Sequence, residues 1–326
     1  MRLETNPFLK IENLEVVFTN KGKKNTVLNR VNFEIPKGKV LGLVGESGCG
    51  KSMTALSIMK LLPPEISAPS GKIFFNDMNL MELSSRDMRQ IRGKRIAMIF
   101  QDPHSVFNPV RSIGRQFIET LQHRMSLSKK EALEVANQSL LEMGLGDSQK
   151  ILSCYPFQLS GGMKQRVMIA MALAMKPDFL IADEPTTALD VTIQAQILIE
   201  IEKLKEKYNT GVLLISHNFG VIAQLSDWVC VMYAGEIIEY GLVKEIFYKA
   251  SHPYTKGLLC SIPDFANNIN SLQQILGQPP EIYEERKGCS FYPRCPYRKD
   301  FCQNNHPLME KINSNHFVSC FFPIQY

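Results

Sequence analysis

The chain has 326 residues, of which 44% are hydrophobic and 21% charged, the balance of a soluble globular protein that can bury a core. Its 37 basic and 32 acidic residues give a net charge of +5, too mild and too dispersed to indicate a nucleic-acid partner. The longest apolar run, Val167–Met175, is about half of a membrane span, and the N-terminus lacks the apolar core of a secretory signal. We therefore expect a cytoplasmic protein.

The first predicted elements are two strands, Leu9–Phe18 and Val27–Ile35, joined by a basic polar turn. Phe18 ends the first strand, where an aromatic ring can stack on adenine, although core packing is nearly as common there. The apolar run Val40–Val44 predicts a buried third strand. Helical spacing over Ser52–Leu62 predicts a helix that stops before two prolines.

Between this strand and this helix stands the pattern G-x-x-x-x-G-K-S, which is typical of a phosphate-binding loop. Its glycines let backbone N–H groups turn toward phosphate oxygens, and the helix N-terminus adds partial positive charge. Lys51 is expected to reach the outer phosphates, and the Ser52 hydroxyl to hold Mg²⁺. A simple Gly- and Ser-rich turn is the alternative, which the flanking strand and helix disfavour. The candidate nucleotide contacts are Gly45, Glu46, Ser47, Gly48, Cys49, Gly50, Lys51, Ser52 and Met53.

The next elements lead to a candidate catalytic glutamine. We expect a strand at Gly71–Phe75, a polar helix at Ser84–Arg92 and a buried strand at Arg95–Phe100. The amide of Gln101, at the mouth of that last strand, can coordinate Mg²⁺ or the attacking water, and the loop Asp102–Arg111 can face a partner. Alone, such a residue would be an ordinary loop glutamine.

Ser112–Ser153 is predicted to be helical, with a break at Gly144–Asp147. It is followed by Leu159-Ser160-Gly161-Gly162. Ser160 is placed to cap a helix that starts near Gly162, and the glycines allow close approach to its free N–H groups. The sequence therefore predicts a second anion site.

Two acidic residues are predicted to end the apolar strand Phe179–Ala182. Asp183 can hold Mg²⁺ through water, while Glu184 can orient the attacking water or accept its proton. Paired acids at a strand end are usually caps or surface residues, but beside the other motifs they favour hydrolysis. A helix at Val191–Tyr208 and a buried strand at Gly211–Ser216 are expected next.

A hairpin, Trp228–Tyr233 with Glu236–Tyr240, is expected to close this region. The phosphate loop, Gln101, the Leu159-Ser160-Gly161-Gly162 signature and the Asp183-Glu184 pair together resemble the ATP-binding subunit of an ABC transporter. The resemblance implies an α/β P-loop NTPase fold, the ABC nucleotide-binding domain, with an antiparallel β subdomain, a helical subdomain and a small cysteine-bearing C-terminal extension. It places the ATP-binding domain at 1–250, with its helical subdomain near 105–163, and the extension at 251–326.

The resemblance also assigns roles that the residues alone do not. It implies that Ser160, Gly161 and Gly162 of one subunit complete the ATP site of another, and that the segment ending in Asp190 crosses this dimer interface. His217, ordinarily a loop histidine, resembles the switch histidine that contacts the γ-phosphate. The implied catalytic residues are Lys51, Gln101, Glu184 and His217, with Mg²⁺ at Ser52, Gln101 and Asp183. Asn218 stands where Asp is usual, which removes a charge near His217.

The extension carries a cysteine cluster, Cys289, Cys295, Cys302 and Cys320. Four thiolates complete either a tetrahedral Zn²⁺ or a four-iron cluster, and the spacings are wider than those of zinc knuckles. This segment is similar to the C-terminal extension of oligopeptide and dipeptide ABC importers, some of which carry an iron–sulfur cluster there. The resemblance thus implies a [4Fe-4S] cluster, with zinc or unliganded thiols as alternatives.

The remaining cysteines stand apart from this cluster. Cys154, Cys230 and Cys260 are expected to be small core residues. Cys49 occupies a position that the phosphate-loop motif leaves free, and alkylating it is expected to block the nucleotide.

The implied function is that of an ATP-binding and ATP-hydrolysing subunit that powers import of oligopeptides or dipeptides. Its implied partners are a second ABC ATPase subunit (another copy or a homologous chain), two transmembrane permease subunits and, through the complex, an external peptide-binding protein. We expect it to lie peripherally on the cytoplasmic face of the cell membrane. The alternatives are an importer of nickel or another small solute, an exporter cassette, and a soluble ABC ATPase without a transport role. That last class usually carries two cassettes or coiled-coil insertions, which are not evident here.

Overall fold

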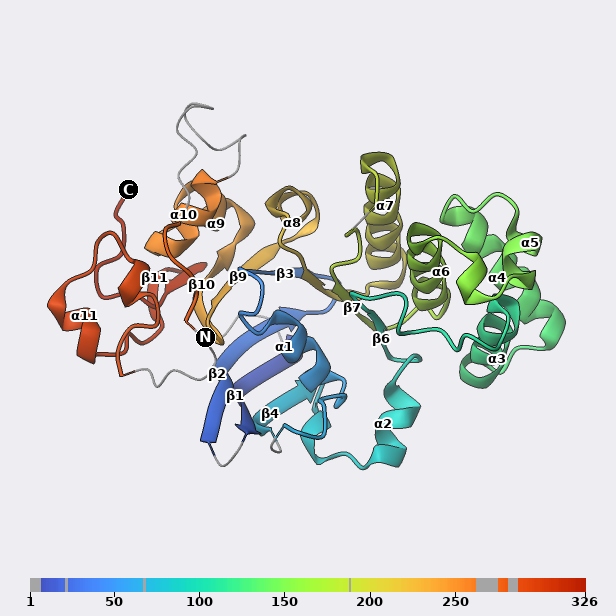
Figure 1. The fold of residues 1–326 in the computed structure, drawn as a ribbon, viewed down its shortest axis with the longest axis horizontal. Helices are drawn as coiled ribbons and strands as arrows, with labels where there is room; N and C mark the ends of the chain where they lie inside the picture. Colours follow the sequence, from blue (N-terminus) through green and yellow to red (C-terminus); the bar gives the residue numbers. More distant parts are fainter. Residues whose placement is uncertain (1–6, 21–22, 67–68, 188, 262–274, 281–286) are drawn as a thin grey trace. The chain divides into compact units, whose positions relative to one another are not determined.

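The computed structural model describes residues 7–20, 23–66, 69–187, 189–261, 275–280 and 287–326. The chain forms two compact units. Unit 1 is built from the described parts of 1–36, 40–82 and 216–326, and unit 2 from those of 37–39 and 83–215. Figure 1 shows their helices and strands.

Unit 1 contains an antiparallel sheet of order β2-β1-β4-β5. Its strands are β1 (Pro7–Asn20), β2 (Lys23–Pro36), β4 (Ser70–Phe75) and β5 (Met78–Asn79). Ile11 of β1 pairs with Phe33 on one side and with Ile73 on the other, and all three side chains are buried. The alternating apolar residues of these strands therefore give the sheet one buried face.

The phosphate-loop strand of unit 1 belongs to a second sheet. In β3 (Val40–Val44) every residue is buried, as expected for a strand covered on both faces. β3 runs parallel to β9 (Trp228–Tyr233), and antiparallel pairing continues through β10 (Glu236–Leu242) and β12 (His316–Val318) to β11 (Glu310–Asn313). The sheet thus joins the phosphate-loop strand to the C-terminal extension.

Helices of unit 1 connect these strands. They are α1 (Lys51–Ile58), η1 (Leu80–Glu82), α8 (Phe219–Leu225), α9 (Val243–Tyr248), α10 (Pro253–Cys260), η5 (Tyr292–Arg294) and α11 (Asp300–Asn304).

Unit 2 has a parallel sheet of order β8-β7-β6 and a group of helices. α4 packs against both α3 and α6, and Figure 1 shows this helical group in green. Its elements are α2 (Ser85–Ile91), β6 (Ile96–Ile99), α3 (Ile113–Met125), α4 (Lys129–Glu142), α5 (Ser148–Ser153), η2 (Pro156–Gln158), α6 (Gly161–Ala174), β7 (Phe179–Asp183), α7 (Val191–Tyr208) and β8 (Gly211–Ile215).

A buried carboxylate joins the extension to β10 within unit 1. Glu239 of β10 is fully buried and accepts hydrogen bonds from His316 Nε2 at 2.7 Å and from the Ser251 and His252 N–H groups at 2.6 and 3.0 Å. A buried carboxylate costs free energy unless it is hydrogen-bonded, so these donors are needed where β10, β12 and the start of α10 meet.

The predicted α/β fold with an antiparallel sheet is confirmed, but some boundaries were wrong. The first helix ends at Ile58 instead of Leu62, because Lys60 adopts a left-handed conformation with φ 48° that closes the helix. The helical stretch 112–153 also has a second break, where Ser126 is left-handed with φ 57° and Ser128 caps α4.

The half-buried positions of Cys154 and Cys260 contradict the expectation that they are core residues; only Cys230 of those three is buried.

Candidate functional site

The phosphate loop of unit 1 runs from the end of β3 to the start of α1. Gly50 takes the N-cap position of α1 in a left-handed conformation with φ 109°. A Cβ on Gly45 would lie 2.2 Å from the Met232 carbonyl oxygen, so only glycine fits there. Ser52 and Met53 follow in the first turn of α1, half-buried. The loop therefore lies between a buried strand and a helix, as the sequence predicts.

Lys51 is held inside this loop. Its side chain is buried, and its Nζ donates to the carbonyl oxygens of Gly45 at 2.7 Å and Glu46 at 2.9 Å and approaches Cys49 Sγ at 3.7 Å. Burial raises the pKa of the Cys49 thiol, so it is neutral at neutral pH. These two hydrogen bonds hold the Lys51 ammonium inside the turn of the loop.

Residues from other parts of unit 1 form hydrogen bonds to the phosphate loop. The Gly235 N–H, in the tight turn between β9 and β10, donates to the Cys49 carbonyl at 2.8 Å. The Tyr254 hydroxyl accepts from the Glu46 N–H at 2.9 Å, and Arg294 donates to both Glu46 carboxylate oxygens. Sequence reasoning missed Tyr254 and Arg294, because no motif or periodicity connects them to the loop.

Three further residues that the sequence analysis singled out lie in unit 1. His217 is exposed, directly before α8. Asn218 caps α8, with its side-chain oxygen accepting from the Gly220 N–H at 2.9 Å, so its amide has a structural partner at this position. Phe18 is half-buried, and its backbone bridges to Ile66.

The two predicted acidic residues of unit 2 lie at the end of β7. Asp183 and Glu184 are buried, with exposed fractions of 2% and 7%. Glu184 has φ 51°, a left-handed conformation that is uncommon outside glycine and clusters at functional sites. Its N–H donates to the Ile215 carbonyl at 2.9 Å, and its carboxylate accepts from the Thr187 hydroxyl at 3.1 Å. The bond to β8 thus holds the backbone of Glu184, and the bond from Thr187 holds its carboxylate.

The signature segment starts α6 as expected. The Ser160 side chain accepts from the Met163 N–H at 3.3 Å, which makes it the N-cap, and Gly161 and Gly162 form the first turn. The buried Lys164 lies 3.1 Å from His104 Nδ1, in the loop that follows Gln101. The signature helix and that loop therefore contact each other within unit 2.

The signature helix also contacts the segment after the acidic pair. Gln165 Nε2 donates to the Pro185 carbonyl at 3.0 Å, and the Asp190 side chain caps α7 by accepting from the Ile193 N–H at 3.0 Å. Gln101 is exposed beyond the end of β6. In unit 2, the helix that starts with the signature segment is therefore hydrogen-bonded to the segment that runs from the acidic pair to Asp190.

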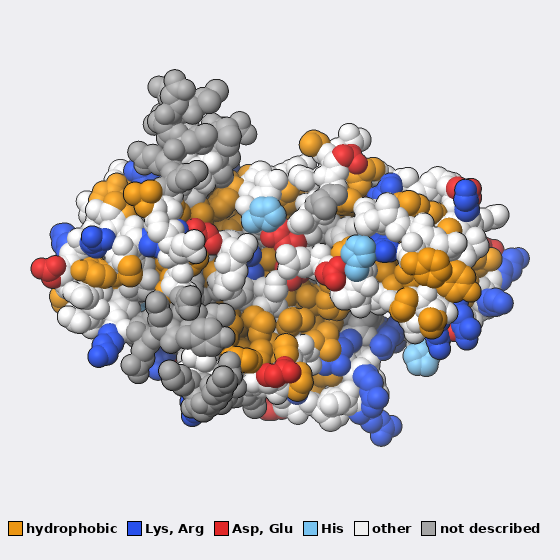
Figure 2. Space-filling model, viewed as in Figure 1, with side chains coloured by type: hydrophobic (Ala, Val, Ile, Leu, Met, Phe, Trp, Pro, Cys, Tyr) orange, Lys and Arg blue, Asp and Glu red, His pale blue; other side chains and the backbone are white. Residues whose placement is uncertain are grey.

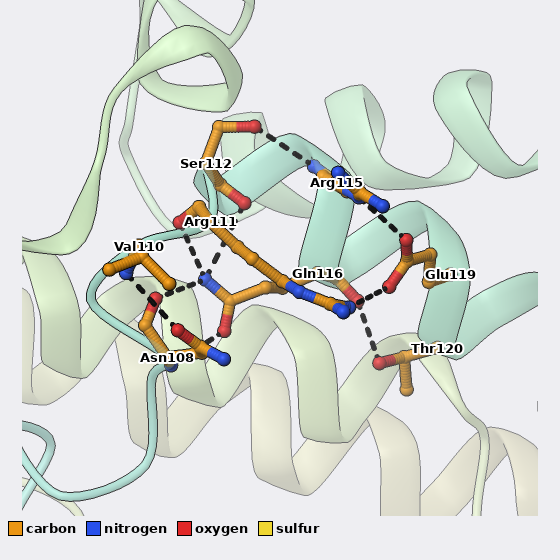
Figure 3. A network of polar contacts seen from close by, with 8 residues as sticks. All are labelled: Asn108, Val110, Arg111, Ser112, Arg115, Gln116, Glu119 and Thr120. Carbon is orange, nitrogen blue, oxygen red and sulfur yellow. Dashed lines mark hydrogen bonds and ion pairs between the residues drawn. The ribbon is translucent and has the colours of Figure 1, made fainter.

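An exposed surface of unit 2 surrounds the start of α3. Arg111 and Arg115 both donate to Glu119 at 2.8 Å, and Gln116 bonds to Asn108, so the loop and helix form the polar network of Figure 3. The Ile113 N–H donates to the Cys154 carbonyl at 2.8 Å.

Apolar side chains are exposed on the segments joined by that bond. Val110 is 79% exposed and Phe157 is 71% exposed, and Tyr155 stacks on Phe157 with ring centroids 5.7 Å apart. Figure 2 shows hydrophobic side chains gathered on part of the surface of the helical group. Exposed apolar groups of this size are typical of contact surfaces.

The four cysteines of the extension line one small cavity, together with aromatic side chains such as Phe291 and Tyr292. Burial, followed by the neighbouring thiols, raises the pKa of Cys289 and of Cys320 to about 11, so both thiols are neutral at neutral pH. Within the described ranges, however, no three His, Cys, Asp or Glu side chains are grouped closely enough to hold a metal ion. The four thiols line one cavity but, as they stand, do not form a ligand set for a metal ion.

Among the helices described here, none has both the length and the apolar run needed to cross a bilayer.

Residues 28–187 match the ABC transporter family, and residues 238–302 match the oligopeptide/dipeptide transporter C-terminal region. The dipeptide transport ATP-binding protein of Bacillus subtilis is 46% identical, with 97% of this chain and 95% of that protein covered. The oligopeptide transport ATP-binding protein of Salmonella typhimurium is 41% identical, with 98% and 95% covered.

Solved structures agree with these sequence relatives. A dimeric ATP-binding cassette in a post-hydrolysis state, bound to ADP and Pi, has a TM-score of 0.66 and 26% identity, covering 72% of this chain and 98% of its own. A component of an ABC transporter complex from Clostridium perfringens has a TM-score of 0.60 and 26% identity, covering 75% and 92%.

Proposed function

The chain belongs to the ABC transporter ATP-binding proteins of the oligopeptide and dipeptide branch, and we propose that it powers uptake of such peptides through separate membrane subunits. The observation that carries the choice of substrate is the match of residues 238–302 to the oligopeptide/dipeptide transporter C-terminal region. As a member of this family it is an ATPase. We further propose a division into an ATP-binding domain, 1–250, with a helical subdomain near 105–163, and a transporter-type extension, 251–326.

Two sets of residues are proposed to act on each ATP. Lys51 and the phosphate-loop N–H groups would grip the phosphates from one subunit, and Phe18 would stack on the adenine. The capped, glycine-started N-terminus of α6 would complete the site from a second subunit, because its N–H groups and helix dipole favour an anion. The residues proposed to bind ATP are Phe18, Gly45, Glu46, Ser47, Gly48, Cys49, Gly50, Lys51, Ser52, Met53, Gln101, Ser160, Gly161, Gly162, Asp190 and His217.

For hydrolysis, Glu184 is proposed to orient water for in-line attack on the γ-phosphate and to accept its proton. His217 would contact the γ-phosphate. Ser52, Gln101 and Asp183 offer the hydroxyl, amide and carboxylate oxygens that Mg²⁺ prefers, and the ion would supply charge neutralisation at the phosphates. Support comes from the buried, conformationally fixed carboxylate of Glu184.

The exposed surface around the start of α3 is proposed to receive a cytoplasmic segment of the membrane subunits. Two observations support this proposal. The apolar side chains of Val110, Tyr155 and Phe157 are exposed there, and hydrogen bonds of Gln116 hold the neighbouring loop against α3. His104, in the loop that leads to this surface, contacts Lys164 of the signature helix, and this contact is proposed to transmit movement between the two. The complete assembly would contain two ATPase subunits, two permease subunits and an external binding protein, with this chain on the cytoplasmic face of the membrane.

The cysteine cavity carries a separable proposal, ligation of an iron–sulfur cluster by Cys289, Cys295, Cys302 and Cys320. Its support is that all four thiols line one cavity. Because they do not form a ligand set as described, the thiols would have to deprotonate and move together on binding. Iron and sulfide analysis of anaerobically purified protein should find both elements, and Cys289→Ser should lose them. Zinc, or no metal at all, would refute this proposal.

The transport role is tested by co-purifying the chain with its membrane subunits and measuring ATP hydrolysis with peptides and with nickel. We expect peptides to stimulate turnover, and Phe157→Glu to abolish co-purification while ATP binding by the isolated chain persists. The exposed Tyr248→Glu, on α9 of unit 1, is the matched control and should leave co-purification intact. Stimulation by nickel alone would replace the peptide assignment, and turnover without any membrane partner would favour a non-transport ATPase.

A further inference from the structure

A residue of the C-terminal extension forms a bidentate ion pair with the phosphate loop. Arg294 Nη1 lies 2.6 Å from Glu46 Oε2, and Nη2 lies 2.9 Å from Oε1. The Arg294 side chain is 5% exposed and that of Glu46 is 26% exposed. Two parallel charge-assisted hydrogen bonds with so little solvent fix both distance and orientation. The pair joins positions 248 residues apart in the sequence.

Arg294 is itself held by the residues around it. Its Nε donates to the Leu276 carbonyl at 3.1 Å, and Nη2 also approaches the Ile275 carbonyl at 3.4 Å. The guanidinium lies 5.8 Å from the centre of the Tyr233 ring, within cation–π range. A guanidinium with this many partners has few alternative positions, so it can act as a fixed support for Glu46.

A second contact holds the backbone of the same loop residue. The Tyr254 hydroxyl accepts from the Glu46 N–H at 2.9 Å. The Tyr254 ring is fully buried and packs against Tyr233 and Phe291, with centroids 4.7 and 5.4 Å away. Thus α10 holds the main chain of Glu46, while the turn η5 holds its side chain.

The position of Glu46 bears directly on the nucleotide grip. Its carbonyl oxygen accepts a hydrogen bond from Lys51 Nζ, the group that must reach the phosphates. A glycine-rich loop without outside support samples more conformers, and ordering these on binding costs affinity. Support from Arg294 and Tyr254 reduces this cost before ATP arrives.

We propose that Arg294 and Tyr254 are positioning residues of the ATP site, through which the C-terminal extension sets nucleotide affinity by holding Glu46. The proposal deepens the proposed function and rests on it, because it takes ATP as the ligand. Neither residue touches the reacting atoms. Their loss should therefore raise the Kd and KM for ATP and leave kcat at saturating ATP nearly unchanged.

The test uses the full-length chain and calorimetric titration with Mg-ATP. Arg294→Met should raise the Kd about tenfold, which corresponds to about 1.4 kcal/mol. Arg294→Lys should recover only part of this loss, because an ammonium cannot bond both carboxylate oxygens in one plane. In a double-mutant cycle with Glu46→Gln, the second substitution should add little to the first.

Tyr254→Phe removes one hydroxyl and keeps the ring, so it tests the proposal even if Arg294→Met does not fold. It should also weaken ATP binding. The matched control is the exposed pair Arg30–Glu15, whose atoms lie 3.2 Å apart; Arg30→Gln and Glu15→Gln should leave the Kd unchanged.

Wild-type ATP affinity in both Arg294→Met and Tyr254→Phe would overturn this inference while leaving the proposed function in place. A wild-type chain that bound no ATP would overturn the proposed function itself.

Discussion

At the scale of single residues, Glu184 combines burial with a strained backbone. Its left-handed φ of 51° occurs in the residue proposed to orient water, and the Thr187 hydroxyl fixes its carboxylate at 3.1 Å. A left-handed conformation outside glycine costs free energy and persists only where the surroundings impose it. Because Glu184 directly follows β7 and its N–H donates to the Ile215 carbonyl of β8, we expect the carboxylate to be oriented before substrate binds.

Glu184→Gln should therefore leave ATP binding intact and reduce ATP turnover by about 10²- to 10⁴-fold, the usual contribution of a general base. The isosteric amide keeps the hydrogen bond to Thr187 but cannot accept the proton. Titration with ATP and release of inorganic phosphate measure the two effects separately. The exposed Glu202→Gln on α7 is the control. Full turnover in the Glu184 variant would remove this residue from the mechanism.

Cys49 lies inside the phosphate loop, where it is 3% exposed and its burial raises the pKa of the thiol. Alkylation of Cys49 should be slow in the folded chain, slower than that of the half-buried Cys154, and ATP should slow it further. Once modified, the chain should no longer bind ATP. Mass spectrometry of a labelling time course measures this order. Labelling of Cys49 as fast as Cys154, or unaffected by ATP, would contradict the account.

At the scale of elements, Ser160 at the start of α6 has two roles: it caps the helix, and it is proposed to bind ATP. Ser160→Ala should cost about 1 kcal/mol of stability through loss of the cap and should also lower ATP turnover. Ser84→Ala removes the equivalent cap of α2, so it should cost similar stability with normal turnover. Chemical denaturation measures the loss of stability, and release of inorganic phosphate measures the loss of ATP turnover. Equal turnover in both variants would assign Ser160 a structural role only.

The N-cap of α10 is the buried His252, so we expect this element to be sensitive to acid. His252 Nδ1 accepts from the Tyr254 N–H at 3.0 Å, and burial lowers the pKa of His252 to about 3. The unfolded chain takes up a proton below the ordinary pKa of 6.5 while the folded chain does not. The contribution of neutral His252 to the free energy of unfolding is therefore fully present above pH 6.5 and is lost as the pH falls toward 3.

Stability should decrease by up to about 1.4 kcal/mol per pH unit in this window. His252→Asn keeps a cap acceptor without a titrating group, so it should flatten the dependence. Denaturant unfolding from about pH 7 to about pH 5 tests this. An unchanged slope in the variant would show that His252 does not cause the acid sensitivity.

Local patterns explain why much of the fold was predictable. The apolar run of β3 and the serine cap of α6 are each encoded by neighbouring residues, and both were confirmed. The end of α1 was not predictable, because Lys60 takes a left-handed conformation for which its side chain gives no signal. The support of Glu46 by Arg294 was also missed, since contacts between distant positions leave no periodicity to read.

At the scale of the whole molecule, unit 1 joins the phosphate loop and the extension through one sheet, β3 to β11, and through the Arg294–Glu46 pair. The extension is thus part of the same compact unit as the loop that is proposed to bind the phosphates of ATP. Unit 2 joins the signature helix to the acidic pair and to the surface proposed to meet the membrane subunits. Unit 1 therefore contains the loop proposed to bind the phosphates of ATP. Unit 2 contains the carboxylate proposed to orient water and the surface proposed to contact the membrane subunits.

The most direct test of this account is ATP-driven peptide uptake by proteoliposomes that contain the membrane subunits, the external binding protein and this chain. We predict uptake with the wild-type chain and Mg-ATP, and none with Lys51→Ala or Glu184→Gln. Peptide uptake that continued at the wild-type rate with either variant would contradict the claim that ATP hydrolysis at these residues powers transport.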